Sequence, residues 1–282
     1  MAECGIKEIL TGNYVMEGAG VKLKRVFGFH DTSLTDPFLL FDHFGSKNPD
    51  DYIKGFPWHP HRGIETVTYM LNGRVEHGDS LGNKGVIGPG DVQWMTAGSG
   101  IVHQEMPEHA PDYLSGFQLW VNLPAENKMS VPKYRDISSE NIPVYSADGI
   151  QAKVISGNFK GVAGASDDIS GSPMYADISL TAGKDITIDI PDGYKAFCYL
   201  YKGSILTGFD KRSISSDAMI IFDMGPGVSV SAVDDSSFIF FAGRPLNEPV
   251  AWRGPIVMNT AEELDTAFNE LSEGTFIKHR LK

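Results

Sequence analysis

Two short stretches carry the side chains with the richest chemistry, a His-Pro-His at 59–61 and a His-Gln-Glu at 103–105. In an extended strand, residues two positions apart point to the same face of the sheet. The first stretch can therefore present two imidazoles together, and the second an imidazole and a carboxylate. Both groups are common ligands of divalent metals. If the strands curl into a barrel, the spacing predicts one interior metal site, made of His59, His61, His103 and Glu105.

The pattern leaves two alternatives open. The first pair of imidazoles could be exposed or hydrogen-bonded without any metal. The carboxylate could come from Glu65, which shares a face with His61 if no bulge intervenes, although Gly63 can mark a bulge that reverses the register. Glu105 is favoured because no glycine separates it from His103.

The distribution of histidines along the chain favours a metal site in the first half. Seven of the eight histidines lie at or before position 109, and the last is near the C-terminus. A second half related to the first would therefore have no imidazole for a metal. His43 is a weaker candidate for a pocket wall. We interpret the remaining histidines as structural or surface residues, namely His30, His77, His109 and His279.

Several function classes are disfavoured by composition and by missing motifs. The net charge of −12, without a basic run, argues against direct nucleic-acid binding, so a link to nucleic acid would need a partner protein. There is no P-loop, no complete dinucleotide fingerprint and no nucleophile elbow. No apolar run is long enough to span a membrane, and the N-terminus lacks the apolar segment of a secretory signal. Two cysteines suit a reducing compartment, so we expect a cytoplasmic protein.

The elements that must position these residues are predicted to be β-strands. The chain has 31 glycines and 16 prolines at short intervals, which is typical of turn-rich β structure. Residues 64–71 end at Asn72-Gly73, a strong hairpin signal, and we expect 74–77 to return as the partner strand. Further strands are predicted at 21–27, 38–44, 92–96, 101–106 and 117–121, and after a polar connection at 186–190, 196–201, 218–222, 228–230 and 237–241.

The two sets of strands share features that indicate a duplicated barrel. Tyr201-Lys202-Gly203 follows an aromatic-rich strand as Leu71-Asn72-Gly73 does, and a Gly-Pro-Gly turn occurs in each half. One helix is predicted near the C-terminus. It begins at a capping box, Thr260 with Glu263, and ends at Gly274. Its apolar residues at 264, 267, 268 and 271 form one stripe that can dock on a barrel.

Longer stretches resemble the pirin family of the cupin superfamily. The resemblance lies in residues 59–67, 88–98 and 100–107, and in the C-terminal run 254–260 followed by a helix. It implies an all-β fold of two tandem cupin barrels, of the double-stranded β-helix or jelly-roll type, with a short C-terminal helix. By this resemblance, 1–135 is a metal-binding barrel, and 136–282 is a degenerate barrel without a metal, ending in the helix. The wider cupin motif would use a glutamate at the place of Glu65.

The resemblance also implies two activities. One is a metal-dependent oxidoreductase of the quercetin 2,3-dioxygenase type, which opens a flavonol-like substrate with dioxygen. The other is a non-enzymatic, iron- or redox-sensing regulator that acts through a protein partner, and that could be nuclear in a eukaryote. Fe(II) is favoured as the metal, with Mn, Ni, Co, Cu or Zn as alternatives.

The resemblance and the residue types together predict roles around the metal. Glu105 would be the ligand or nearby base that takes the proton of the flavonol hydroxyl. Arg62 would sit at the pocket rim or be a solvated loop cation. The apolar walls of the substrate pocket would be Phe56, Trp58, Trp94 and Met95, with plain core packing as the alternative for each.

Overall fold

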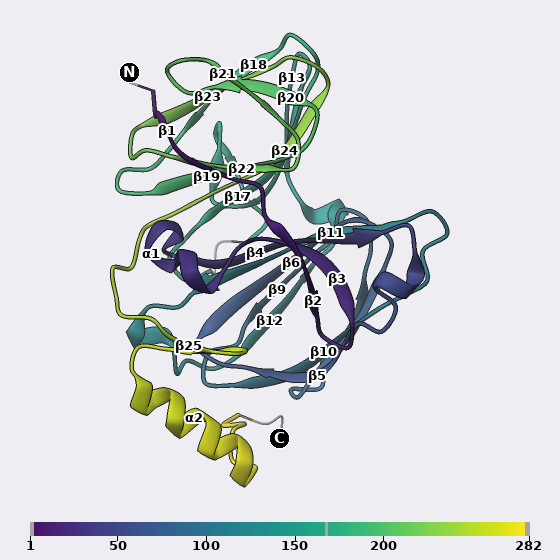
Figure 1. The fold of residues 1–282 in the computed structure, drawn as a ribbon, viewed down its shortest axis with the longest axis vertical. Coiled ribbons are helices and arrows are strands. Elements are labelled where there is room, and N and C mark those ends of the chain that lie inside the picture. Colours follow the sequence, from purple (N-terminus) through teal and green to yellow (C-terminus); the bar gives the residue numbers. More distant parts are fainter. Residues whose placement is uncertain (1–2, 167–168, 280–282) are drawn as a thin grey trace. The chain divides into compact units, whose positions relative to one another are not determined.

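The computed structural model describes residues 3–166 and 169–279 and forms two compact units (Figure 1). The first barrel comprises 13–139 and 246–282, and the second barrel comprises 1–12 and 140–245. The junction at 139 lies close to the predicted boundary at 135. The chain ends differ from the prediction, because the N-terminal strand belongs to the second barrel and the C-terminal helix to the first. Among the described residues no helix is both long and apolar enough to span a membrane.

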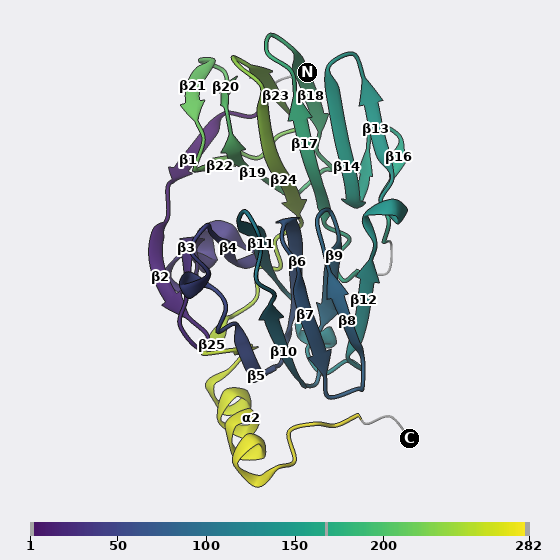
Figure 2. The same cartoon turned by 90° about the vertical axis from the view of Figure 1, so that its right-hand side faces the viewer.

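The first barrel is built from two antiparallel sheets. Its larger sheet has seven strands in the order β12-β9-β6-β11-β4-β3-β2, and the smaller has four in the order β5-β10-β7-β8; Figure 2 shows β6, β9 and β12 side by side. The larger sheet contains β2 (Asn13–Glu17), β3 (Val21–Phe27), β4 (Phe38–Ser46), β6 (Ile64–Asn72), β9 (Val92–Thr96), β11 (Leu114–Asn122) and β12 (Lys133–Ile137). The smaller contains β5 (Phe56–His61), β7 (Val75–Asp79), β8 (Lys84–Ile87) and β10 (Ile101–Pro107).

The turn at Asn72-Gly73 forms as predicted, but the strand after it has a different partner. Gly73 has φ +81°, a left-handed conformation that glycine adopts without strain. Strand β6 is already paired on one side with β9 and on the other with β11. Strand β7 therefore crosses to the smaller sheet, where it pairs with β8 and β10. The prediction of a simple hairpin was wrong on this point.

The second barrel repeats the strand order of the first. Its larger sheet runs β1-β22-β19-β24-β17-β14-β13 and its smaller sheet β18-β23-β20-β21. The larger sheet contains β1 (Ile6–Leu10), β13 (Val144–Ala147), β14 (Ile150–Ser156), β17 (Met174–Leu180), β19 (Lys195–Lys202), β22 (Ala218–Phe222) and β24 (Ser236–Gly243). The smaller contains β18 (Asp185–Asp189), β20 (Ser204–Thr207), β21 (Arg212–Ser215) and β23 (Gly227–Ala232); a separate two-stranded ladder joins β15 (Asn158–Phe159) and β16 (Val162–Ala163). The predicted all-β fold of two cupin barrels is confirmed.

The two barrels differ in where their edge strand comes from in the sequence. The edge of the larger sheet is β12 in the first barrel, paired with β9. In the second barrel the same place is taken by β1 from the start of the chain, paired with β22 (Figure 1). The strand that closes the second barrel thus precedes it in sequence.

The C-terminal segment is part of the first barrel. It contains β25 (Ala251–Arg253), β26 (Ile256–Met258) and α2 (Ala261–Glu273), while a short helix α1 (Thr32–Thr35) precedes β4. The predicted capping box of α2 is confirmed, since the Glu263 amide donates to Thr260 Oγ1 at 3.2 Å and the Thr260 amide to Glu263 Oε2 at 3.0 Å. The apolar stripe of α2 packs with Ile256, Met258 and Phe276.

Candidate metal centre

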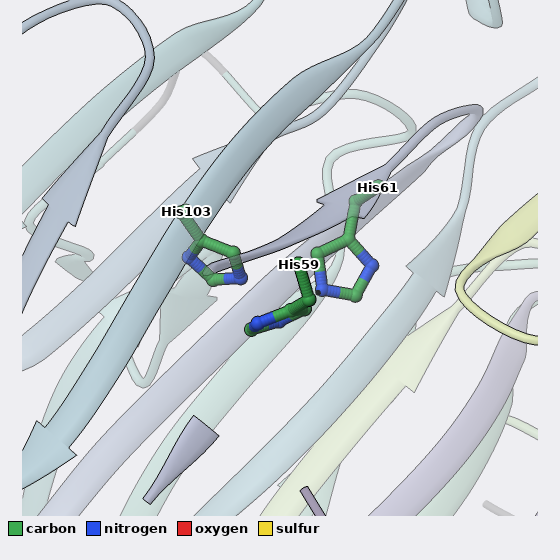
Figure 3. A group of neighbouring side chains, drawn as sticks. All are labelled: His59, His61 and His103. Carbon is green, nitrogen blue, oxygen red and sulfur yellow. Dashed lines mark hydrogen bonds between the residues drawn. The ribbon is translucent and has the colours of Figure 1, made fainter. Parts of the chain in front are cut away.

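Three imidazoles meet inside the first barrel. Strands β5 and β10 are antiparallel neighbours, and His103 is the cross-strand partner of His59. His61 lies two residues farther along β5, on the same face. One ligand atom from each of the three side chains lies within 4.8 Å of the others, and Figure 3 shows the rings turned toward one another. The i, i+2 spacing of the sequence therefore brings these three side chains together.

Backbone carbonyls fix the orientation of two of the rings. The Nδ1 of His59 lies 2.9 Å from the carbonyl oxygen of Pro57, and the Nδ1 of His61 lies 3.2 Å from that of Pro255. Because a carbonyl can only accept, each Nδ1 carries the proton in a neutral ring, which leaves a lone pair on Nε2. The two Nε2 atoms lie 3.0 Å apart. Two lone pairs at that separation call for a shared cation.

Burial keeps the rings of His61 and His103 neutral. It lowers the pKa of His61 well below its usual range, and the nearby His59 adds to the effect. Burial also lowers the pKa of His103 well below its usual range, with His61 and His59 contributing. Within the described residues, neither ring nitrogen of His103 has a hydrogen-bond partner. A neutral imidazole with a free nitrogen lone pair is the form that binds a divalent metal, so the donor set fits such an ion.

Glu105 lies beside this group but outside the three-histidine cluster. A register shift between His103 and Glu105 separates the two positions on β10. The Glu105 carboxylate lines the same cavity as His59 and His61, and its Oε1 lies 3.0 Å from Thr68 Oγ1. Burial raises its pKa, and His59 and the Thr68 bond oppose the rise. Its role as the fourth ligand stays a prediction.

The alternative carboxylate is engaged elsewhere. Glu65 is buried and accepts hydrogen bonds from Trp94 Nε1 at 3.1 Å and Thr96 Oγ1 at 2.7 Å. It is not among the described residues that line the cavity of the histidines. Glu65 therefore holds β9 against β6, where its cross-strand partner is Thr96.

A cavity of about 450 Å³ opens beside the histidines within the first barrel. That volume lies in the range of small-molecule sites. His59 and His61 line it, and the Trp120 ring lies edge-on to His61 with 5.1 Å between centroids. Much of the wall is apolar, from Val21, Leu23, Phe29, Leu40, Phe44, Phe56, Val75, Leu114, Trp120 and Trp252.

A line of polar side chains crosses this cavity. Adjacent strands β6, β11, β4 and β3 place Thr68 beside Gln118, Gln118 beside Asp42, and Asp42 beside Arg25. We call Thr68, Gln118, Asp42 and Arg25 the polar row. Thr68 Oγ1 lies 2.7 Å from Gln118 Oε1, and Arg25 donates to both oxygens of Asp42 at 2.9 and 2.8 Å. Arg25 also donates to Glu17 at 2.7 Å.

Asp42 is the carboxylate of the polar row, and it is buried. Its residue is 3% exposed, and burial raises its pKa to about 6 despite the opposing bonds from Arg25. A carboxylate in such a place is either paired or protonated. The polar row was missed from the sequence, although single polar residues within apolar strands, such as Gln118 between Phe117 and Leu119, were an available signal.

Of the predicted pocket residues, only Phe56 lies among the described residues that line the cavity. Trp58 is 54% exposed, because it alternates with His59 and so faces the outside of β5. Trp94 and Met95 are fully buried in packing outside the cavity. The tryptophans that do line the cavity are Trp120 and Trp252, which sequence reasoning did not select.

Arg62 is neither a rim residue nor a solvated cation. It is 1% exposed and donates to the carbonyl oxygens of Ser99 at 2.8 Å and Phe276 at 2.9 Å. Its guanidinium also pairs with Glu270 at 2.7 Å and stacks on the Phe276 ring at 4.2 Å. Arg62 therefore binds the C-terminal segment to the strand that carries His59 and His61.

The C-terminal segment also reaches the metal centre itself. Pro255 supplies the carbonyl that orients His61, and Trp252 and Gly254 line the cavity. The approach is close, since a Cβ on Gly63 would lie 1.9 Å from the Val257 carbonyl oxygen. Buried Lys128 adds hydrogen bonds to the carbonyls of Gly63 and Val257. Residues 252–257 of the C-terminal segment are thus structural parts of the site.

The other histidines lie outside the three-histidine cluster. His77 is buried, with Nδ1 at 2.5 Å from Tyr134 Oη and Nε2 at 3.3 Å from Asp136. His43 lies 3.4 Å from Ser115 Oγ and does not line the cavity among the described residues. His30 and His109 are exposed. Across residues 3–166 and 169–279, the three-histidine cluster is the one group found with metal-ligand spacing.

Comparisons with known proteins agree with this architecture. The pirin family model matches residues 20–121, and the model of the pirin C-terminal cupin domain matches residues 175–277. A pirin-like protein of Caulobacter vibrioides is 44% identical over 273 residues, covering 96% of this chain and 98% of the relative. Human pirin is 42% identical over 257 residues, covering 89% and 86%.

A solved structure extends the agreement to three dimensions. A protein from Acinetobacter baumannii named quercetin 2,3-dioxygenase superposes with a TM-score of 0.90 at 33% identity, covering 98% of this chain and 99% of that chain. Together with the matches over both barrels, this likeness spans nearly all of the sequence. The chain belongs to the pirin family.

Proposed function

We propose that this protein is a metal-dependent dioxygenase that opens flavonols such as quercetin with dioxygen. The observation that carries the proposal is the three-histidine cluster, two members of which, His59 and His61, line a largely apolar cavity of about 450 Å³. Flat aromatic substrates suit such a cavity, because its aromatic walls can bury their faces. The name of the Acinetobacter baumannii relative, quercetin 2,3-dioxygenase, supports the same substrate class.

The metal would be held by His59, His61 and His103, with Glu105 as the proposed fourth ligand. When bound, a divalent ion, Fe(II) by preference, would supply Lewis acidity and positions where substrate and dioxygen meet. The reaction consumes one flavonol and one dioxygen and yields a ring-opened ester and carbon monoxide. Mn, Co, Ni, Cu and Zn are the alternative metals to be compared.

The protein's own groups would bind the substrate and move its proton. Trp120 and Phe56 provide apolar surface against which the flavonol rings pack, and packing there excludes water. Glu105 takes the proton of the flavonol hydroxyl, a role that its position on the cavity wall with His59 and His61 favours. Thr68 borders the Glu105 carboxylate, with 3.0 Å between Thr68 Oγ1 and Glu105 Oε1.

The test is turnover after anaerobic reconstitution. The purified protein is loaded with each divalent metal in turn, mixed with quercetin, and then exposed to dioxygen while carbon monoxide and quercetin absorbance are measured. We expect turnover with at least one metal and its loss in His103→Ala. The matched control is His109→Ala, because His109 is exposed and lies outside the metal-competent cluster. Absence of turnover with every metal would contradict the enzyme and favour the non-enzymatic regulator.

A further inference from the structure

The polar row contains a gap at its centre. Thr68 contacts Gln118, and Arg25 holds Asp42, but among the described residues no hydrogen bond joins Gln118 to Asp42. These two residues are cross-strand partners on β11 and β4, and both line the cavity. Cross-strand partners have Cβ atoms about 5 Å apart, so one small polar group lying between the two side chains can contact both.

The groups on the two sides of the gap have complementary hydrogen-bonding capacity. Gln118 accepts through Oε1 from Thr68, and its Nε2 makes no hydrogen bond with another described residue. Arg25 occupies one lone pair on each oxygen of Asp42, and a carboxylate offers about four acceptor positions. A donor therefore stands on one side of the gap and an acceptor on the other. A hydroxyl group, which both accepts and donates, satisfies both.

The charges around the gap select the kind of hydroxyl compound. Arg25 lies between the two carboxylates of Asp42 and Glu17, so the ionised cluster has a net negative charge. Such a cluster repels a carboxylate or phosphate on a ligand and favours a neutral donor. The surrounding walls include aromatic rings of Phe44 and Phe56, which favour a hydroxyl carried on an aromatic ring.

We infer that the polar row is a recognition subsite for a phenolic hydroxyl of the substrate, which bridges Gln118 Nε2 and the Asp42 carboxylate. The inference rests on the proposed function and adds a selectivity to it. The row begins at the metal centre, because Thr68 Oγ1 lies 3.0 Å from Glu105 Oε1. Asp42 lies two strands from Thr68, or about 10 Å along the sheet. A ligand with one end at the histidines can therefore reach the gap with a distant ring.

Binding of three flavonols in the absence of dioxygen tests the subsite. 3-Hydroxyflavone has the metal-chelating group and no other hydroxyl, galangin adds two hydroxyls on the fused ring, and quercetin adds two more on the pendant ring. Affinities for the metal-loaded protein are measured by absorbance titration. We expect quercetin, galangin or both to bind about fivefold or more tighter than 3-hydroxyflavone, the fold-change expected for one net hydrogen bond.

The variant Gln118→Met removes the amide and keeps the length of the side chain. It is expected to reduce that preference to about one, with the affinity for 3-hydroxyflavone changed less than about twofold. Asp42→Asn is the second variant and should reduce the preference in part from the other side of the gap, because it replaces a charged acceptor by a neutral amide oxygen. The matched control is Gln104→Met, because Gln104 alternates with His103 and Glu105 on β10 and does not line the cavity among the described residues.

The outcomes separate this inference from the proposed function. Equal affinities for all three flavonols in the unmodified protein would overturn the subsite and leave the dioxygenase intact. Equal weakening of all three ligands by Gln118→Met would also overturn it, since that result indicates a general packing role. Selective binding without turnover in dioxygen would support the subsite and contradict the dioxygenase. Absence of binding by any flavonol would overturn both.

Discussion

The polar row of the first barrel has an apolar counterpart in the second. Thr68 and Cys198 each lie five residues before the glycine of an equivalent turn, Gly73 and Gly203. From Thr68 the register continues through the polar row. From Cys198 it continues through Phe240, Ala176 and Val154, on strands of the same order. Four polar positions in one sheet thus correspond to four apolar positions in the other.

The same difference separates the smaller sheets. In the first barrel, neighbouring strands β5 and β10 present His59, His61 and His103 to the interior. In the second barrel the corresponding pair, β18 and β23, buries Ile186, Ile188, Val228 and Val230 in one continuous apolar core. The same strand arrangement can therefore enclose either a packed apolar core or a binding cavity. The choice depends on side chains at inward positions and leaves the backbone pattern unchanged.

The largest expected effect concerns metal content. If only the first barrel binds metal, the purified protein should contain no more than about one divalent ion per chain, and His59→Ala should reduce the bound metal to near zero. Elemental analysis beside His109→Ala, which changes an exposed histidine, measures this. A full equivalent of tightly bound metal remaining in His59→Ala would place a site outside the three-histidine cluster and end the contrast between the barrels.

Two matched truncations, one in each barrel, compare how tightly the two interiors are packed. Phe240 and Gln118 occupy equivalent places in the two sheets, and Phe240 is fully buried in the core of the second barrel. Phe240→Ala should lower the free energy of unfolding by about 3–5 kcal/mol, because it leaves a void among packed side chains. Gln118→Ala should cost about 1 kcal/mol or less, because Gln118 already borders a cavity.

Thermal and urea unfolding followed by circular dichroism and calorimetry provide the values for both variants. Similar losses for the two would show that the interior of the first barrel is packed as tightly as that of the second. A cavity of about 450 Å³ beside Gln118 argues against that result.

A second matched pair tests the attachment of the C-terminal segment, which only the first barrel has. Arg62 and Arg253 each pair with a carboxylate of α2 and stack on a phenylalanine. Arg62 is 2% exposed in its side chain and Arg253 is 52% exposed. Arg62→Met should therefore lower the free energy of unfolding of the first barrel by about 3–4 kcal/mol, and Arg253→Met by less than about 1 kcal/mol.

Arg62→Met should also weaken metal binding, because the segment that Arg62 holds carries the Pro255 carbonyl that orients His61. Metal affinity and limited proteolysis near residue 276 are the readouts. Equal losses of stability and of metal affinity in the two arginine variants would contradict this prediction. They would mean that the buried contacts of Arg62 hold the C-terminal segment no more strongly than the exposed Arg253 pair does.

Local patterns made part of this structure predictable from the sequence. The two-residue spacing predicted that His59 and His61 share a face, and the capping box predicted the start of α2, because both depend on residues close together in the chain. Trp58 was misplaced although it is adjacent to His59, since an alternating strand sends neighbours to opposite faces.

The remaining features depend on partners far apart in sequence. The polar row requires the register of four strands, and no local pattern states which residue of β4 lies beside Gln118. Arg62 is buried by Glu270 and Phe276, more than two hundred residues later. The partner of β7 and the exchange of the chain ends likewise follow from which sheet edges are already occupied.

The smallest expected effect is a pH dependence confined to the first barrel, caused by Asp42, whose counterpart Ala176 cannot ionise. The pKa of Asp42 rises from 3.8 to about 6 in the folded chain, with burial as the main cause. A raised pKa means that the folded state binds this proton more tightly than the unfolded state. The stabilisation is therefore complete below about pH 4 and is lost as the pH rises through about 6.

The stability of the unmodified protein relative to Asp42→Asn should thus fall by up to about 3 kcal/mol between about pH 4 and pH 7.5. Tryptophan fluorescence during urea unfolding isolates the first barrel, because all four tryptophans, Trp58, Trp94, Trp120 and Trp252, belong to it. The second barrel, followed in the same samples by circular dichroism, should unfold alike in both proteins. A stability difference that does not change with pH would mean that the Arg25 pair keeps Asp42 ionised throughout, and that its burial carries no free-energy cost.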